Sequence, residues 1–194
     1  MSTFISNFTE LGLRDFNTRE LASANPPAEL VHFGVWHNYA NNYKSRIGHC
    51  KIENCRWGGL TIDGKYVVES VKKYFDVDLK PVSVEYFNQP FHYDGKLYHF
   101  DGADGDPPYL AVVREVFQDG DALRMTGIIY NAEEMFNGES KNPADYQSAT
   151  FEATARPYKF KGKDTWSILS LKSDWGNEKK IEERIFDVEI PAAG

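Results

Sequence analysis

The chain has 194 residues and a formal net charge of −7, from 22 basic and 29 acidic residues. This length allows one large domain with a sizeable core, and the content of 41% hydrophobic and 14% aromatic residues argues against a disordered chain. No apolar run in the sequence approaches the ~20 residues of a membrane-spanning helix, and the acidic balance works against nonspecific binding to nucleic acid or anionic membranes.

Helices are predicted in the N-terminal part of the chain. Asn17 is a typical N-cap for a short helical turn. Asn25, followed by two prolines, predicts the start of a longer helix that runs to about Tyr43. Asp63 predicts a cap for a third helix over residues 64–75, because valines and aromatic residues recur there on one face.

Alternating strands and turns are predicted after Pro81. Residues 91–100 are typical of a hairpin, since an Asp-Gly pair at the centre supplies the positive φ angles of a tight turn. Two further strand pairs follow, residues 109–117 with 122–131 and residues 146–160 with 165–173. No helix long enough for a parallel crossover separates them. The predicted fold class is therefore α+β, with N-terminal helices packed on one face of a curved, mainly antiparallel sheet of about six strands.

We expect one compact domain with three parts: a helical segment and loop over residues 1–59, a sheet domain over residues 60–175 and a charged arm over residues 176–194. The acidic excess is local, because residues 101–152 carry 3 basic and 11 acidic residues, a net charge of −8. This stretch is either a solvated acidic face or a surface for a cation or a basic partner.

Three aspartates in a glycine-containing turn, Asp101, Asp104 and Asp106, form a candidate calcium site. Calcium requires several oxygen ligands from a flexible loop, and aspartate with glycine supplies them. The spacing lacks the alternate carboxylates and the distal glutamate of an EF-hand. The same residues are common in ordinary turns between strands, so a plain turn is the alternative.

Cys50 and Cys55 are the only cysteines. In an exported protein they could close a small disulfide loop, whereas in a cytosolic protein we expect two reduced thiols. A zinc knuckle would require two further ligands, and His49 is the only one close in sequence. The spacing of the two cysteines does not decide between these alternatives.

His92 and His99 flank the predicted hairpin turn, and with Trp36 they mark a candidate ligand cavity between the sheet and the helices. With Asp-Gly as the two turn residues, these histidines are not expected to lie opposite each other. The sequence contains no nucleophile elbow, phosphate loop or Rossmann glycine pattern. A small hydrolase or isomerase could still pair either histidine with Glu85 or Asp101.

Several short segments between residue 60 and about residue 173 carry a resemblance to a known domain: Val67-x-x-Ser70-Val71-Lys72-Lys73-Tyr74-Phe75, Tyr93-Asp-Gly-Lys-Leu-Tyr98, Gly102-Ala-Asp-Gly105, Val112…Val116-x-x-Asp-Gly120, Met125-Thr-Gly127-Ile-Ile-Tyr130, Arg156-Pro-Tyr158 and Trp166-Ser-Ile-Leu-Ser-Leu171. With them the chain resembles a domain of uncharacterised envelope proteins and lipoproteins of anaerobic bacteria. The resemblance implies an α+β roll of cystatin-like or NTF2-like type with no established activity. The chain departs from it by lacking the lipid-attachment signal.

The sequence thus predicts a non-catalytic module that binds a small molecule or a protein, at the bacterial cell envelope, with the small hydrolase or isomerase as the alternative. No cofactor is expected other than calcium, and no nucleic-acid partner. Residues 1–8 lack the basic and apolar regions of a signal peptide. An envelope or extracellular location is therefore expected only if a leader was removed, and a cytoplasmic one otherwise.

Overall fold

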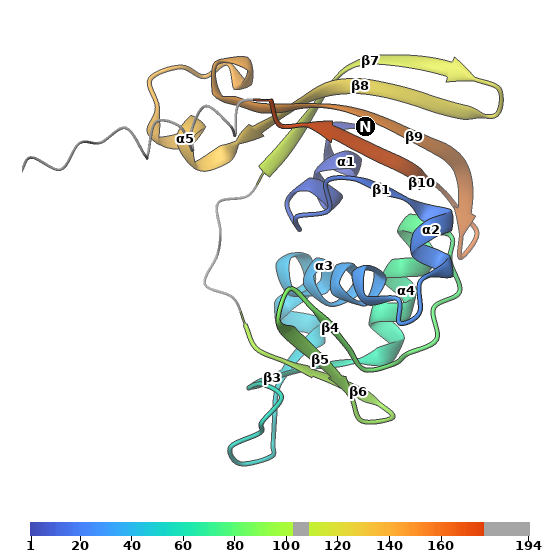
Figure 1. Ribbon diagram of the computed structural model, residues 1–194, viewed down its shortest axis with the longest axis vertical. Coiled ribbons are helices and arrows are strands. Elements are labelled where there is room, and N and C mark those ends of the chain that lie inside the picture. Colours follow the sequence, from blue (N-terminus) through green and yellow to red (C-terminus); the bar gives the residue numbers. More distant parts are fainter. Residues whose placement is uncertain (103–108, 177–194) are drawn as a thin grey trace, which may run out of the picture.

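The computed structural model describes residues 1–102 and 109–176. They form three layers, with helices between a larger and a smaller antiparallel sheet of five strands each (Figure 1). The predicted α+β class with antiparallel strands is confirmed. Asp104, Asp106 and the charged arm after residue 176 lie outside the described residues.

The larger sheet has the strand order β1-β10-β9-β8-β7, with every neighbouring pair antiparallel. Its strands are β1 (Phe16–Asn17), β7 (Tyr109–Asp119), β8 (Ala122–Asn131), β9 (Gln147–Phe160) and β10 (Lys163–Asp174). The two strand pairs predicted in this region are confirmed. Between β8 and β9 lie the helix α5 (Ala132–Asn137) and the 3-10 helix η1 (Pro143–Tyr146).

The smaller sheet has the order β2-β3-β6-β5-β4. Its strands are β2 (Ile47–His49), β3 (Leu60–Asp63), β4 (Val84–Tyr86), β5 (Gln89–Tyr93) and β6 (Leu97–Phe100). This arrangement differs from the predicted single sheet with helices on one face. The difference arises because β3 pairs with the free edge of β6, so that the hairpin β5–β6 does not continue into β7. Alternation along a strand defines its faces but not its neighbours.

The helices are α1 (Ser2–Thr9), α2 (Thr18–Ser23), α3 (Ala28–Arg46) and α4 (Gly64–Phe75). Two of the three predicted caps are confirmed, since Asn17 accepts a hydrogen bond from the Arg19 backbone and Asp63 accepts one from the Lys65 backbone. The predicted start of the long helix at Asn25 is wrong, because α3 begins at Ala28, with Pro27 as its N-cap and no side-chain cap hydrogen bond. The helix α1 was not predicted. Gly34 of α3 permits close packing on α4, because a Cβ there would lie 2.6 Å from Cγ1 of Val67.

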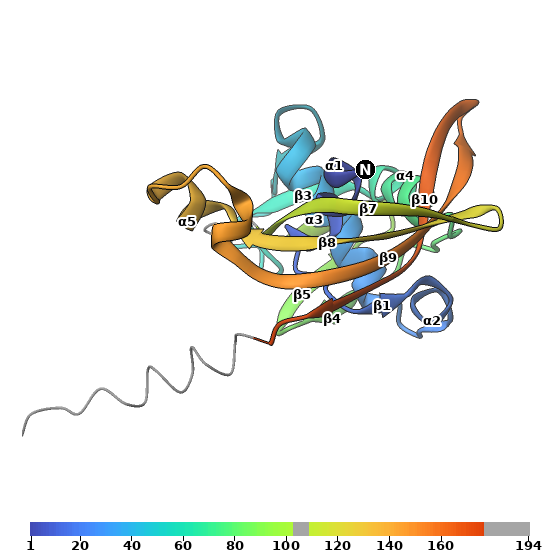
Figure 2. The ribbon, with the colours of Figure 1, turned by 90° about the horizontal axis from the view of Figure 1, so that it is seen from above.

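Aromatic rings form the centre of the core between the two sheets. Phe8 of α1 packs against Phe33 of α3 at 5.3 Å between ring centroids, and Phe75 of α4 contacts both rings. All three side chains are buried. The helices therefore present apolar faces to both sheets, and the view from above shows them beneath the larger sheet (Figure 2). No helix of the described residues is long and apolar enough to cross a membrane.

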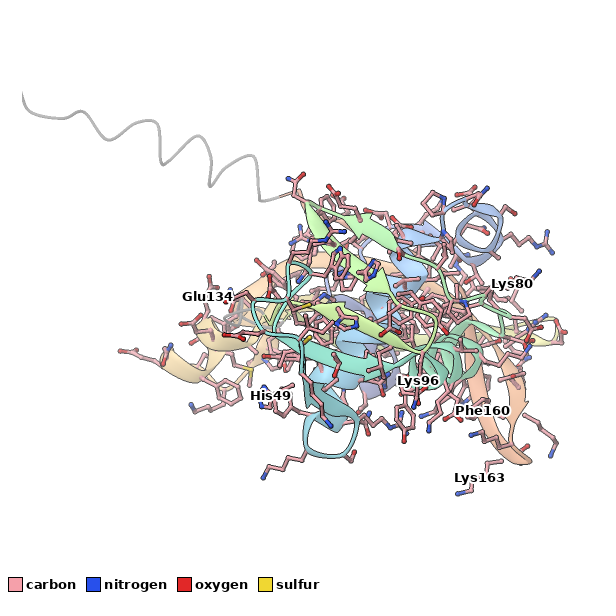
Figure 3. The ribbon with its side chains drawn as sticks, turned by 90° about the horizontal axis from the view of Figure 1, so that it is seen from below. His49, Lys80, Lys96, Glu134, Phe160 and Lys163 are labelled. Carbon is pink, nitrogen blue, oxygen red and sulfur yellow. The ribbon has the colours of Figure 1, made fainter. Side chains whose placement is uncertain are left out.

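The pleat of β6 divides its side chains between two environments. Tyr98 and Phe100 are fully buried, and Phe100 packs on Trp36 and Tyr39 of α3. Because successive side chains of a strand point to opposite faces, His99 lies on the outer face of the smaller sheet. Figure 3 looks onto this outer face. Yet His99 is only 3% exposed, so something other than the helices must cover it.

Candidate metal centre

The loop between β2 and β3 covers His99. The loop is closed at its base by a hydrogen bond of 2.9 Å from the Cys50 N–H to the Gly59 carbonyl. A hydrogen bond of 3.1 Å from the Gly59 N–H to Asp101 Oδ1 fixes its end to the residue after β6. Gly58 has a φ of +120°, and a Cβ there would lie 2.1 Å from the Phe100 carbonyl carbon. Only glycine lets the loop approach the backbone of β6 this closely.

The register of β2 and β3 decides which side chains of the loop reach His99. Thr61 pairs with His99, so both lie on the outer face, and Gly48 pairs with Thr61. Two residues further along, Cys50 is opposite Gly59 and returns to the same face. His49 consequently points to the other face, and the single nearby zinc ligand expected from the sequence is not brought to the cysteines.

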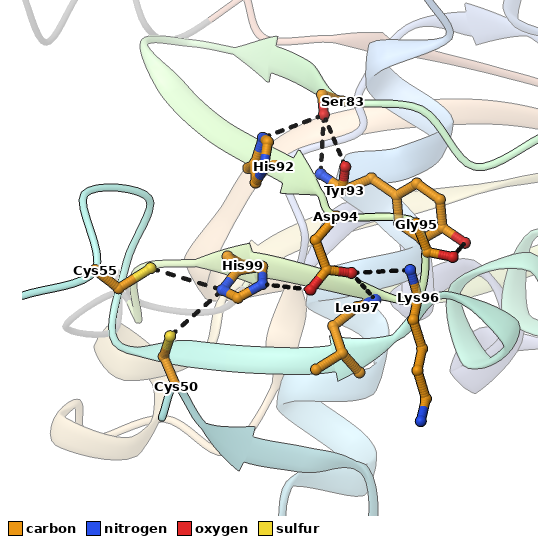
Figure 4. Close-up of polar contacts among 10 residues, drawn as sticks. All are labelled: Cys50, Cys55, Ser83, His92, Tyr93, Asp94, Gly95, Lys96, Leu97 and His99. Atoms are coloured by element: carbon orange, nitrogen blue, oxygen red, sulfur yellow. Dashed lines mark hydrogen bonds and ion pairs between the residues drawn. The ribbon is translucent and has the colours of Figure 1, made fainter. Parts of the chain in front are cut away.

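The two cysteines and His99 converge on one point from distant parts of the chain (Figure 4). Sγ of Cys50 lies 3.4 Å from Nδ1 of His99, and Sγ of Cys55 lies 3.6 Å from the same atom. The three donor atoms all lie within 4.8 Å of one another. Both thiols are free and partly exposed. A disulfide between Cys50 and Cys55 stays a prediction for an oxidising compartment.

Asp94 holds the imidazole of His99 from the opposite side. Its Oδ2 lies 3.0 Å from Nε2 of His99, while its Oδ1 accepts hydrogen bonds from the backbone N–H groups of Lys96 and Leu97. The hydrogen bond from His99, followed by those two backbone bonds, lowers the pKa of Asp94 to about 2. An ionised carboxylate only accepts, so Nε2 of the neutral ring carries the hydrogen and Nδ1 presents its lone pair to the sulfurs.

The position of Asp94 shows that the predicted register of the hairpin is wrong by one residue. We expected Asp94 and Gly95 to be the two turn residues, but Asp94 precedes the turn and its N–H bonds to the Leu97 carbonyl at 3.0 Å. The turn residues are therefore one position later in the chain, and His92 pairs directly with His99. An aspartate that accepts bonds from the following backbone amides favours the first position of a turn, which explains the shift.

The distances around Nδ1 of His99 fit a metal ion better than hydrogen bonds. A tetrahedral zinc ion, with a Zn–S distance of about 2.3 Å and a Zn–N distance of about 2.0 Å, places each sulfur roughly 3.6 Å from the nitrogen. The observed values are 3.4 and 3.6 Å. A thiol hydrogen bond has a similar length, but the single lone pair of Nδ1 can accept from only one of the two cysteines. One cation satisfies both sulfurs and the nitrogen together.

The two thiols differ in acidity. The hydrogen bond from the Trp57 backbone lowers the pKa of Cys55, and a hydrogen bond from Cys50 acts in the same direction. The pKa of Cys50 is raised, because burial and the neighbouring Cys55 outweigh a backbone hydrogen bond from Ile52. Two thiolates in contact repel each other, and a divalent cation between them removes that repulsion.

An aromatic stack lies next to the cluster. The rings of Trp57 and His92 are parallel to within 8°, with centroids 3.7 Å apart. Their centroids lie 6.2 and 6.0 Å from that of His99, respectively. The Arg56 guanidinium lies 4.3 Å from the Trp57 centroid, on the ring face that His92 leaves free. Nδ1 of His92 lies 3.4 Å from the Ser83 hydroxyl.

The remaining candidate residues lie apart from this cluster. Trp36 is on the inner side of the smaller sheet, where it donates a hydrogen bond to Gln89, so the sheet separates it from His92 and His99. Glu85 is exposed on β4. Asp101 is exposed and accepts the bond from Gly59. The carboxylate that His99 contacts is thus Asp94.

Sequence reasoning missed His99 and Asp94 as partners of the cysteines. His99 lies 49 residues from Cys50 and 44 from Cys55 in the chain, a separation that no local zinc motif spans. The available signal was the alternation in β6, which makes His99 the one polar residue between two buried aromatic residues. No protein-family model matches the chain, and comparisons with curated proteins and with solved structures find no match.

Proposed function

We propose that the protein is a metal-binding module, and that Cys50, Cys55 and His99 hold a zinc ion. The observation that supports this most strongly is the position of two sulfurs at the distance of tetrahedral zinc ligands from one imidazole nitrogen. Zinc is the preferred ion because two thiolates and an imidazole suit a borderline-soft cation, whereas calcium and magnesium require oxygen.

The bond from His99 to Asp94 supports the same proposal. Histidines that bind metals generally donate their second ring hydrogen to a carboxylate or a carbonyl, which fixes the tautomer and raises the basicity of the ligating nitrogen. Here Asp94 is itself held by two backbone N–H groups, so the imidazole is oriented before any ion arrives. In this proposal, the ligand of the binding module expected from the sequence is a zinc ion. Its location at a bacterial envelope remains a proposal that rests on the resemblance alone.

Zinc stoichiometry tests the proposal. The reduced protein is purified without oxygen, loaded with zinc, desalted and analysed for metal. We expect one zinc per chain in the wild type, and loss of stoichiometric zinc in Cys50→Ser, Cys55→Ser and His99→Asn. Asp94→Asn should retain a site that is about 10–100-fold weaker.

His49→Asn is the matched control, because it removes an imidazole adjacent to Cys50 in sequence but on the other face of β2. It should bind zinc like the wild type. Absence of zinc from the reduced wild type, or dependence of binding on His49, would overturn the proposal. Formation of a disulfide in the reduced and sealed sample would do so as well, since oxidised cysteines cannot bind the ion.

The spatial arrangement of Cys55, His99 and Asp94 suggests a second candidate function. A thiol beside an imidazole whose other nitrogen contacts a carboxylate is the arrangement of thiol-dependent hydrolases, and it revives the expected hydrolase with His99 and Asp94 as the pair. The two functions differ in their use of the cysteines. A nucleophile is one residue, so only one serine variant would lose hydrolysis of an activated ester, whereas a zinc site requires both cysteines equally.

A further inference from the structure

The described residues supply three candidate metal ligands, and no other His, Cys, Asp or Glu among them has a donor atom within 4.8 Å of all three. Both carboxylate oxygens of Asp94 accept hydrogen bonds from His99 and from the turn. Oδ1 of Asp101 accepts the Gly59 N–H. His92 stacks on Trp57 and lies against Ser83. A tetrahedral ion would therefore keep one position for a ligand from outside these residues.

Solvent reaches the cluster from the loop side. His99 approaches from the sheet and is buried, but Cys50 and Cys55 are both partly exposed. The stack of Trp57 and His92 stands beside the imidazole and forms a wall along one flank. A small molecule could thus approach the cluster from the side on which both cysteines are partly exposed.

We propose that the metal centre is open, and that its fourth position exchanges water for a small thiol, which binds as the thiolate and releases its proton to the solvent. This inference rests on the proposed zinc site. An ion with two thiolates carries no net charge, and its soft ligands favour a further soft donor over a hard oxygen anion. The carbon atoms of such a thiol would lie at the edge of the Trp57 ring, because His92 and Arg56 cover its two faces. The guanidinium of Arg56, which lies over the Trp57 ring, offsets the negative charge that a third thiolate brings.

Cobalt substitution tests the open position, because Co²⁺ occupies zinc sites and its visible spectrum reports the ligands. The full chain is loaded with Co²⁺ without oxygen and titrated with 2-mercaptoethanol. We expect a saturable shift of the d–d bands, and a rise in sulfur-to-cobalt charge-transfer intensity of about half, since three thiolates replace two. Cobalt content after desalting should remain at one per chain.

Variants separate the open position from its alternatives. His92→Ala should bind cobalt with the wild-type spectrum before thiol is added, because His92 is not among the three grouped donors. Arg56→Gln should bind cobalt equally well but need a several-fold higher thiol concentration for half-saturation. Lys51→Gln is the matched control, since it removes an exposed positive charge from the same loop and should leave the titration unchanged.

The outcomes distinguish this inference from the proposed function. If Co²⁺ gives no sulfur charge-transfer band, the proposed metal site itself fails. If the bands appear but the thiol leaves them unchanged, the site exists and is closed, and the inference is overturned. Loss of cobalt on adding thiol would also overturn it. Dimerisation that requires cobalt would do the same, because a second chain would then supply the fourth ligand.

Discussion

Acidification should destabilise the protein through a histidine that is buried among aromatic rings of the helices. His37 of α3 is 6% exposed, and its ring stacks on Phe33 at 5.4 Å with an interplanar angle of 8°. Burial lowers its pKa to about 4, and the positive charges of Lys73 and Arg46 act in the same direction. The folded protein therefore holds this imidazole neutral where an unfolded chain would protonate it.

The magnitude follows from the two pKa values. The contribution of His37 to stability is complete above the ordinary pKa of 6.5 and is lost as the pH falls from 6.5 to about 4. The difference between these two pKa values corresponds to a loss of about 3 kcal/mol in the free energy of unfolding. His32, which burial also shifts to a pKa of about 4, adds a loss of similar size in the same window. Glu10 acts in the opposite direction, because burial raises its pKa.

Urea unfolding, followed by tryptophan fluorescence at several pH values, measures this effect. His37→Gln removes the titrating group, so the variant should lose about 3 kcal/mol less than the wild type between neutral pH and pH about 4. Glu10 and His32 are unchanged in both proteins and cancel in the comparison. His49→Gln, at an exposed position, should keep the wild-type dependence. Equal pH dependence in wild type and His37→Gln would refute the reasoning.

Three further predictions concern the loop, the core and calcium. Gly58→Ala should destabilise the protein by about 1–3 kcal/mol and weaken zinc binding, because the new Cβ would clash with the Phe100 backbone. Gly59→Ala is the control, since there is open space around Gly59, and its thermal melts and zinc titrations should be near those of the wild type. Val71→Asp should abolish cooperative unfolding by placing a charge in a fully buried position of α4, and a wild-type melt would show that the helix face is misassigned. If the aspartate turn that starts at Asp101 binds calcium, saturating calcium must raise the melting temperature of chelator-treated protein, and coincident melts would remove that site from consideration.

Local patterns predicted the elements of this fold well. Asn17 and Asp63 cap the helices that their side chains indicated, and the two long hairpins of the larger sheet lie where the turn residues placed them. These features depend on residues within a few positions of one another. The partition of strands into two sheets does not, because the pairing of β3 with β6 joins segments about 38 residues apart and has no local signature.

The candidate site shows the same limit more sharply. The spacing of Cys50 and Cys55 left a disulfide, two reduced thiols and a zinc site open, and the choice among them depends on a third residue supplied by another strand. A shift of one residue at Asp94 then changed which side chains face each other across the hairpin. Both the position of His99 and the shift at Asp94 depend on how the strands pair. The spacing of residues along the chain describes only the loop that contains the cysteines.

Asp94 links the register of the hairpin to the orientation of the His99 imidazole. One of its carboxylate oxygens sets the hairpin turn and the other orients the imidazole of His99. A hairpin that slipped by one residue would turn His99 to the opposite face of the sheet and lose the carboxylate partner in the same step. Zinc would then select the correctly paired hairpin from its misregistered competitors. An ion at this centre would therefore favour the correct strand register during folding.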